Sequence, residues 1–348
     1  NIFRKPCPPM PLIISRRTYT ITGNASVAPV CFTAFLAICF LHGFLNIFSG
    51  AALSSILTDA AYMTIVALGI GFQLKFGRFD FSGGALIVVS ATIGGVVADA
   101  CSGGIIVLVI VSVVTAVVLS VINASVYSWL KIPISVVSLA MAYLFEAIPG
   151  IVLGGDAGPN IMFMSEYNKL GLFPLIFVPF AVACILYFCY DKFTVVGRQS
   201  TLLARNQGAA VNIGINEKKN VIVCYIVSGI LFGLAGAVYA TQNTLVVITT
   251  PLQTAGTLFS NIIPSLVGLF LSRFIDDTLG TFVGAFTISM LYFGLESMGV
   301  LSGMRTIYYA VFLAAFIFIS GFWDQIKMFA GNMFRKIIHK LTPDKLKS

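Results

Sequence analysis

Three acidic side chains lie inside long apolar stretches of this sequence: Asp59, Glu146 and Glu296. A charged side chain at the centre of a bilayer costs about 2.5–3.5 kcal/mol on insertion scales, so such residues are functional candidates. No Lys or Arg lies centrally in these stretches to neutralise them. Each acid must therefore be protonated, face water, or pair with a polar neighbour such as Asn123 or Tyr292. They could line a solute pathway, relay protons, or join two helices by a hydrogen bond.

The sequence contains no motif for nucleotide or metal chemistry. It has no G-x-x-x-x-G-K-[ST] phosphate loop and no G-x-G-x-x-G following a strand. Its histidines, His42 and His339, form no metal cluster and no H-E-x-x-H motif. The seven cysteines are scattered and include no C-x-x-C pair. We predict no catalytic residue, no metal site and no cofactor in this chain, so any ATP and Mg²⁺ must be bound by a separate ATPase chain.

The composition indicates an integral membrane protein. Of the 348 residues, 58% are hydrophobic and 10% are charged, whereas soluble domains carry about 25% charged residues. The 30 Phe and 32 Gly residues are also typical of membrane helices, because Phe is stable in lipid and Gly allows close helix approach. We therefore predict an all-α fold in a membrane.

Ten apolar stretches are long enough to cross a bilayer, which needs about 20 residues of helix. They cover residues 28–48, 51–74, 83–100, 104–129, 132–153, 172–190, 221–246, 255–272, 280–298 and 303–322. The third contains Gly94, Gly95 and Asp99, and the eighth contains Pro264 and Gly268. Either could be a shortened or re-entrant helix, which is stable where protein or water satisfies its backbone.

The basic residues predict the orientation. If the N-terminus is cytoplasmic, 19 of the 21 Lys and Arg residues lie inside, and only Lys169 and Arg305 lie outside. Because cytoplasmic loops are enriched in Lys and Arg, we predict that both termini and residues 191–220 face the cytoplasm. The predicted parts are a cytoplasmic N-terminal segment (1–26), a transmembrane domain (27–322) and a basic cytoplasmic tail (323–348). The net charge of +8 then belongs to membrane-flanking loops and does not indicate nucleic acid binding.

Two loops could meet soluble partners. Residues 197–220, GRQSTLLARNQGAAVNIGINEKKN, are a polar and net basic stretch between two long apolar spans. They form either a docking surface for a cytoplasmic partner or a basic loop held by anionic lipid headgroups. Residues 154–171 on the outer side are either a plain connector or a docking surface for an extracytoplasmic partner.

Several short motifs, taken in order from about residue 50 to 320, resemble the ribose-type permeases of ATP-binding-cassette importers. The matching residues of the 197–220 loop are Gly197-Arg198, Arg205 to Ala210, Gly214 to Asn216, and Lys219. Elsewhere they are Phe79 to Gly84, Asn123, Leu130 to Pro133, Ser228-Gly229, Gly233 to Gly236, Gly280-Thr281, Gly284-Ala285, Gly294 and Gly299-Val300. The order and spacing of these pieces together carry the resemblance.

The resemblance implies a cytoplasmic coupling helix between spans six and seven. A short helix formed by Ala209 and Ala210, ended at Gly214, would enter a groove on the ATPase and move as a lever when ATP closes two ATPase subunits. The residues expected at this contact are Arg198, Arg205, Asn206, Ala209, Ala210, Gly214 and Lys219. Those expected along the substrate pathway are Asp80, Ser82, Asn123, Glu146 and Glu296, although Asp80 or Ser82 could instead cap span three.

The sequence departs from the family pattern at several places. Gln207-Gly208 stands where an acidic residue usually precedes the paired alanines, and Leu271 to Asp277 replaces a Gly-rich stretch. Tyr292-Phe293-Gly294 replaces an Asn-Asn-Gly sequence, and Glu296 stands where Asn is common. These changes leave the substrate open and are compatible with one half of a heterodimer.

The resemblance implies a multi-pass permease of the bacterial inner membrane, which is a transport subunit and not an enzyme. Its partners would be ATPase subunits, a second permease copy or paralogue, an extracytoplasmic solute-binding protein and membrane lipid. The implied cargo is a pentose or related small sugar, with autoinducer-like sugars, galactose and nucleosides as alternatives. An ion-coupled secondary carrier that uses Asp59, Glu146 or Glu296 as its proton site is a hypothesis of a different class, as is a non-transporting scaffold.

Overall fold

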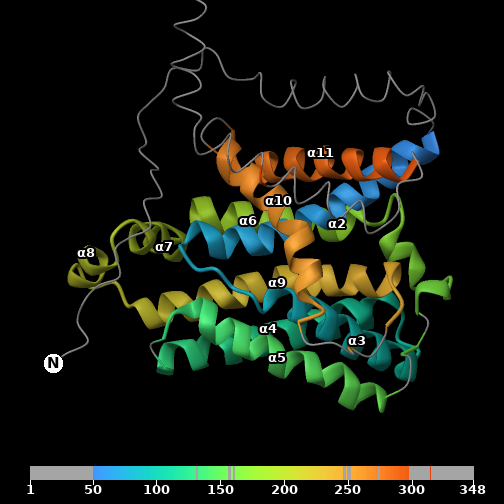
Figure 1. Cartoon of the computed structure of the whole chain (residues 1–348), viewed down its shortest axis with the longest axis horizontal. Coiled ribbons are helices and arrows are strands. Elements are labelled where there is room, and N and C mark those ends of the chain that lie inside the picture. Colours follow the sequence, from blue (N-terminus) through green and yellow to red (C-terminus); the bar gives the residue numbers. More distant parts are fainter. Residues whose placement is uncertain are drawn as a thin grey trace, which may run out of the picture.

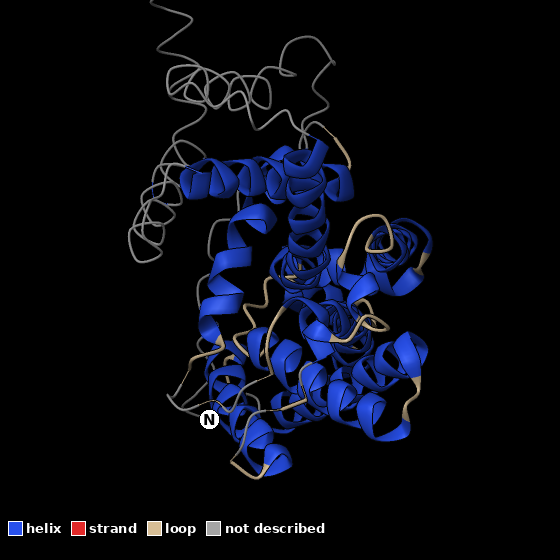
Figure 2. Ribbon diagram, turned by 90° about the vertical axis from the view of Figure 1, so that its right-hand side faces the viewer, coloured by secondary structure: helices blue, strands red, loops and turns tan. Residues whose placement is uncertain are grey.

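A computed structural model describes residues 50–130, 132–155, 158–159, 161–245, 248, 252–272, 275–297 and 314. Every regular element in these residues is a helix, as Figures 1 and 2 show. The prediction of an all-α fold is therefore confirmed for the described residues. The predicted N-terminal segment, the first span (28–48), the last span (303–322, apart from residue 314) and the basic tail lie outside them.

Eight helices coincide with the second to ninth predicted spans. They are α2 (Gly50–Lys75), α3 (Gly83–Cys101), α4 (Gly104–Leu130), α5 (Ile134–Leu153), α6 (Phe177–Phe193), α9 (Glu217–Gln242), α10 (Ala255–Leu271) and α11 (Asp277–Ser297). The shorter elements are η2 (Ile161–Phe163), η3 (Asn168–Gly171), α7 (Val195–Arg205) and α8 (Gln207–Asn212).

Six of these helices are long and apolar enough to cross a membrane. They are α2, α3, α4, α5, α9 and α11. The number rises to seven if α6 and α7, which are bent by 72° relative to each other, are counted as one broken span. At 17 residues α10 is shorter, and it continues through Pro264, which lies inside the helix and does not break it. The described residues thus support a multi-pass membrane protein with six or seven candidate spans.

Two helix boundaries differ from the predicted ones for local reasons. The span predicted over 172–190 begins as turns, and α6 starts at Phe177, three residues after Pro174. The span predicted over 221–246 starts earlier, at Glu217, because the Asn216 side chain caps it. The Lys219 backbone N–H donates to Asn216 Oδ1 at 3.1 Å.

The core of the bundle is built around α9, which runs between α2 and α6 on one side and α4 and α5 on the other (Figure 1). Its side chains Leu231, Phe232 and Ala235 are fully buried. Apolar side chains on the outer helices are instead exposed, including Ile106 of α4 and Ile151 of α5. Such an apolar outer face is stable in lipid and would be unstable in water.

Helix α10 crosses the bundle at a steep angle between α11 and α9 (Figure 1). Its first residues rest on the start of α3, where a Cβ atom added to Gly84 would lie 2.2 Å from the Thr254 carbonyl oxygen. Glycine at position 84 therefore permits a close backbone contact that any larger residue would block. Thr254, the residue before α10, is consequently buried against the start of α3.

Candidate functional site

Helices α7 and α8 protrude together at one end of the bundle, on the left in Figure 1. The sequence motifs predict a short helix at α8 but leave the preceding stretch, α7, as a loop. Thr194 starts α7, because its Oγ1 accepts a hydrogen bond from the Gly197 N–H at 3.0 Å. A threonine in this position, three residues before Gly197, is the sequence signal that could have revealed the helix.

Buried polar contacts fix α7 to the ends of α6 and α9. Ser200 Oγ donates to Asn220 Oδ1 at 2.9 Å, and Asn220 Nδ2 donates to the Val196 carbonyl oxygen at 3.1 Å. Ser200 Oγ also lies 3.2 Å from Cys224 Sγ and 3.5 Å from the Tyr190 hydroxyl. Because Ser200 and Asn220 are almost completely buried, these bonds are shielded from water. Helix α7 is thus held against α6 and α9 at once.

Helix α8 contains the paired alanines and ends just before Gly214, the residue predicted to end it. Asn206 caps it, since Asn206 Oδ1 accepts a hydrogen bond from the Ala209 N–H at 3.0 Å. Gly214 follows the helix with φ +92°, a conformation that favours glycine. Ala210 is buried in a small cluster with Leu203 and Ile215, whereas Ala209 is exposed. Ala210 therefore packs α8 against its neighbours, whereas Ala209 faces outward.

The outer face of α7 and α8 combines positive charge with exposed apolar side chains. Arg198, Arg205 and Lys219 are all exposed. Among the large apolar residues nearby, Ile213 is 72% exposed and Val211 is 45% exposed. Exposed apolar side chains bordered by charged groups are typical of protein interaction surfaces. All seven residues predicted for ATPase contact lie in this region or at the first turn of α9.

Gln207, which stands where the family has an acidic residue, hydrogen-bonds an acid from another helix. Gln207 Nε2 donates to Glu217 Oε1 at 2.7 Å. Glu217 lies in the first turn of α9, where a negative charge also interacts favourably with the helix dipole. The Glu217 carboxylate therefore lies beside α8, although the acidic residue of the family pattern would stand at the position of Gln207 or Gly208.

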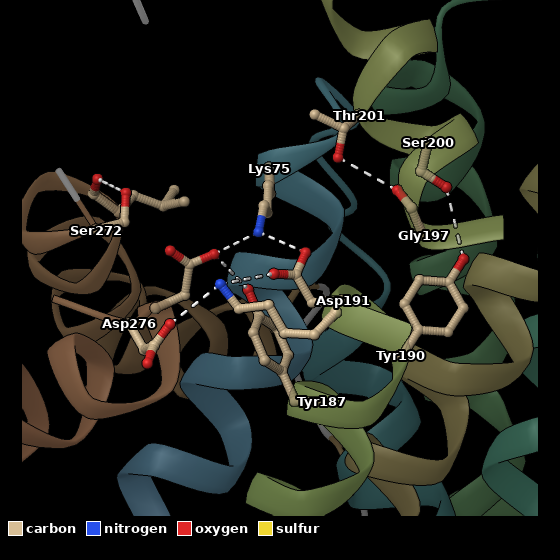
Figure 3. A network of polar contacts seen from close by, with 12 residues as sticks. Lys75, Tyr187, Tyr190, Asp191, Gly197, Ser200, Thr201, Ser272 and Asp276 are labelled. Atoms are coloured by element: carbon tan, nitrogen blue, oxygen red, sulfur yellow. Dashed lines mark hydrogen bonds and ion pairs between the residues drawn. The ribbon is translucent and has the colours of Figure 1, made fainter. Parts of the chain in front are cut away.

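An ion-pair network joins α2, α6 and α11 close to the start of α7 (Figure 3). The Lys75 ammonium group pairs with Asp191 at 2.6 Å and with Asp277. Lys192 pairs with Asp276 at 3.0 Å, and the Tyr187 hydroxyl donates to Asp277 Oδ2 at 3.4 Å. This network was not predicted from the sequence. It could have been predicted, because Lys75, Asp191 and Asp277 carry opposite charges and stand close to the ends of three predicted spans that we expected on the cytoplasmic side.

Three of the predicted pathway residues come together in one buried cluster. Asn123 Nδ2, from α4, donates to Ser82 Oγ at 2.8 Å and to Asp80 Oδ1 at 3.4 Å. Asp80 Oδ1 also accepts bonds from the Ser82 N–H at 2.8 Å and the Ser82 hydroxyl at 2.7 Å. Burial raises the pKa of Asp80, and the hydrogen bonds from Ser82 and Asn123 act in the opposite direction. The cluster holds the loop before α3 against α4.

The other two predicted pathway residues lie elsewhere. Glu146 is buried in α5 and accepts bonds from the backbone N–H groups of Leu252 at 2.7 Å and Thr254 at 2.8 Å. It therefore anchors the chain that enters α10. Glu296 is exposed on α11 and lies near enough to Asp59 of α2 for their charges to interact. The structure thus divides the five residues into three separate places.

Known proteins match most of this chain. Residues 52–320 match the family described as branched-chain amino acid transport system / permease component. An autoinducer 2 import system permease protein of Photorhabdus luminescens is 24% identical over 274 residues, which are 76% of this chain and 81% of that protein. A galactose/methyl galactoside import permease protein of Haemophilus influenzae is 21% identical over 271 residues, 71% of this chain and 79% of that protein.

A third relative is a D-allose transport system permease protein of Escherichia coli. It is 23% identical over 192 residues, which cover 53% of this chain and 58% of that protein. No solved structure matches the chain.

Proposed function

This chain belongs to the branched-chain amino acid transport system / permease component family, and we propose that it forms the translocation pathway for a small sugar in an ATP-driven importer. The relatives that match over most of its length are named for autoinducer 2 and galactose, and a shorter match is named for D-allose. The proposed cargo is a small sugar or sugar-like solute, either of the kinds named for these relatives or a pentose, which the resemblance to ribose-type permeases implies. The chain is a transport component, and ATP and Mg²⁺ are proposed to bind a separate ATPase chain.

The α7–α8 surface is the proposed docking site for this ATPase, and it is the observation that carries the proposal. A capped, exposed helix beside basic side chains can enter a groove on a partner. Ala209 leaves room for close backbone contact, while Arg198 and Arg205 can bond carboxylate or carbonyl oxygens of the partner.

The contacts behind this surface provide a route by which ATPase closure would reach the membrane helices. Movement of α7 would pull on α9 through Ser200 and Asn220, because their bond is buried. It would also pull on α6, which continues into α7, and thereby on α2 and α11 through Asp191 and Lys75. Such rigid-body displacement of packed helices is a common way to switch a transporter between two openings.

The proposed topology has ten spans, with both termini and the α7–α8 surface in the cytoplasm of a bacterium. It is supported by the distribution of basic residues between the two sides. A second permease chain, identical or paralogous, and an extracytoplasmic solute-binding protein would complete the transporter. The outer segment that includes η2 and η3 is the proposed contact for the binding protein.

The test is co-purification of the chain with the proteins encoded beside its gene, followed by measurement of ATP hydrolysis. We expect an ATPase to co-purify. Ala209→Glu should abolish this association, because it places a larger charged side chain at the contact, and should leave abundance and membrane insertion unchanged. Ala209→Ser, which keeps a small side chain, is the matched control and should retain the ATPase. An Ala209→Glu variant with normal ATPase association would contradict the docking site.

A further inference from the structure

A pocket of about 390 Å³ lies between α3, α9 and the chain that enters α10. Its lining includes Val88 and Leu245, but most of the other side chains carry neutral polar groups. These polar residues are Thr92, Tyr239, Thr244, Gln253, Thr254, Thr257 and Ser260. No Asp, Glu, Lys or Arg is among the described residues that line the pocket. The pocket was not predicted from the sequence and is separate from the Asp80 cluster.

The position of Glu146 in α5 indicates how deep in the membrane the pocket lies, because Glu146 is bonded to the chain at the floor of the pocket, at Leu252 and Thr254. It is twelve residues into α5 (Ile134–Leu153), which at 1.5 Å per residue is roughly 18 Å along a helix that crosses a hydrocarbon core of about 30 Å. Its carboxylate accepts hydrogen bonds from Leu252 and Thr254, so these residues are held near the middle of the membrane. Thr254 itself lines the pocket.

The chain at this floor is irregular and needs such an anchor. Leu252 has φ +58°, a left-handed conformation that is uncommon for a residue with a side chain. Non-helical backbone at this depth is tolerated where it is buried in protein or lines a water-filled cavity. Glu146 satisfies the N–H groups of Leu252 and Thr254, and Thr254 is also one of the residues that line the polar pocket. This irregular stretch is therefore bonded to a buried side chain and borders a polar pocket.

We propose that this pocket binds a neutral polyhydroxylated solute of monosaccharide size, and that Glu146 positions its floor. The hydroxyl and amide groups of the lining can donate to and accept from sugar hydroxyls, and Tyr239 adds an aromatic surface. A charged solute would have no oppositely charged partner in the described lining. This proposal rests on the proposed function, because it places the sugar inside this chain.

The first experiment measures access to the pocket. Ser260→Cys is introduced into a Cys101→Ser, Cys189→Ser background, because both cysteines are exposed, and the labelling rate by a membrane-impermeant maleimide is measured on intact cells. Ser165→Cys, exposed in the segment between η2 and η3, is the matched control. We expect both thiols to be labelled from outside. D-ribose, D-allose or D-galactose at about twice its Kd should slow labelling at Ser260→Cys about threefold, and gluconate should not.

The second experiment measures transport by the complete transporter in liposomes with the same three labelled sugars. Thr257→Val removes one pocket hydroxyl and should raise KM about five- to tenfold with little change in kcat, since one hydrogen bond to the sugar is lost. Thr287→Val is the control, because the Thr287 hydroxyl bonds the Val283 carbonyl oxygen within α11. It should leave KM unchanged.

The possible failures are distinguishable. No labelling of Ser260→Cys from outside, labelling that none of the three sugars slows, or an unchanged KM in Thr257→Val would each overturn the pocket proposal. If the wild type at the same time transports a sugar with ATP, the proposed function stands without the pocket. If no ATPase associates with the chain, the proposed function itself is wrong, whatever the labelling shows.

Discussion

Lys75 joins three helices through a single ammonium group. It ends α2 and pairs with Asp191 of α6 and Asp277 of α11, and all three side chains are largely shielded from water. An exposed ion pair contributes little to stability. Removing one member of a shielded group is more costly, because the remaining charges lose their partner without regaining full hydration.

Lys75→Met should therefore destabilise the protein by about 1–3 kcal/mol, which a lower midpoint in thermal unfolding of the detergent-purified chain would reveal. The matched change is Lys192→Met, because Lys192 is 44% exposed, its nearer partner Asp276 is 49% exposed, and its other partner Asp191 lies 4.0 Å away. Its expected effect is about 0–1 kcal/mol. Equal losses in the two variants would show that shielding does not matter at this site.

The residue types of the candidate site could be predicted from the sequence, but their partners could not. Asp80, Ser82 and Asn123 were predicted from motifs that resemble those of the permease family, and the structure brings them together. Glu146 was predicted as an acid inside an apolar stretch, yet its partners are backbone N–H groups of residues 252 and 254. Backbone donors carry no signature in the sequence, so this anchor depends on the fold.

At the scale of elements, the chain between α6 and α9 shows why short helices are difficult to predict. In α7 the buried residues are Gly197, Ser200 and Leu203, which follow the spacing of a helix face although only Leu203 is a large apolar residue. A helix of this length is marginal in water and depends on tertiary contacts. Those contacts are the buried bonds to Asn220 and Val196, which only the folded chain brings together.

The attachment of α7 to α9 leads to a prediction about coupling. Asn220→Ala removes the bonds to Ser200 and to the Val196 carbonyl oxygen. We expect the ATPase to remain bound and active while the amount of sugar transported per ATP falls several-fold, because α7 would move without moving α9. Thr201→Val is the control, since that hydroxyl bonds the Gly197 carbonyl oxygen within α7. A parallel loss of hydrolysis and uptake in Asn220→Ala would contradict this role.

At the scale of the whole molecule, hydropathy predicted the spans better than their arrangement. Each of the second to ninth predicted spans coincides with a helix, because a bilayer demands long apolar helices. The steep angle of α10 and the 72° bend between α6 and α7 were not predictable in the same way. They depend on close contacts such as the one between Gly84 and Thr254, which joins residues far apart in the sequence.

The proposed topology predicts which segments face each side of the membrane. Alkaline phosphatase fused after Ser165 should be active, because it would lie outside, and the same enzyme fused after Asn206 should be inactive. Green fluorescent protein at the C-terminus should fluoresce, since that end is predicted to be cytoplasmic. The physical reason is the excess of Lys and Arg on the inner side. Active phosphatase after Asn206 would reverse the orientation.

The central claim is that ATP hydrolysis by a partner drives a sugar through this chain. Its most direct measurement is uptake of labelled D-ribose, D-allose and D-galactose into vesicles that contain the complete transporter, with internal ATP held constant and an uncoupler added. The account predicts that uptake of at least one sugar continues with the uncoupler and stops when ATP is replaced by a non-hydrolysable analogue. Uptake that collapses with the uncoupler while ATP is present would contradict it and would favour an ion-coupled carrier.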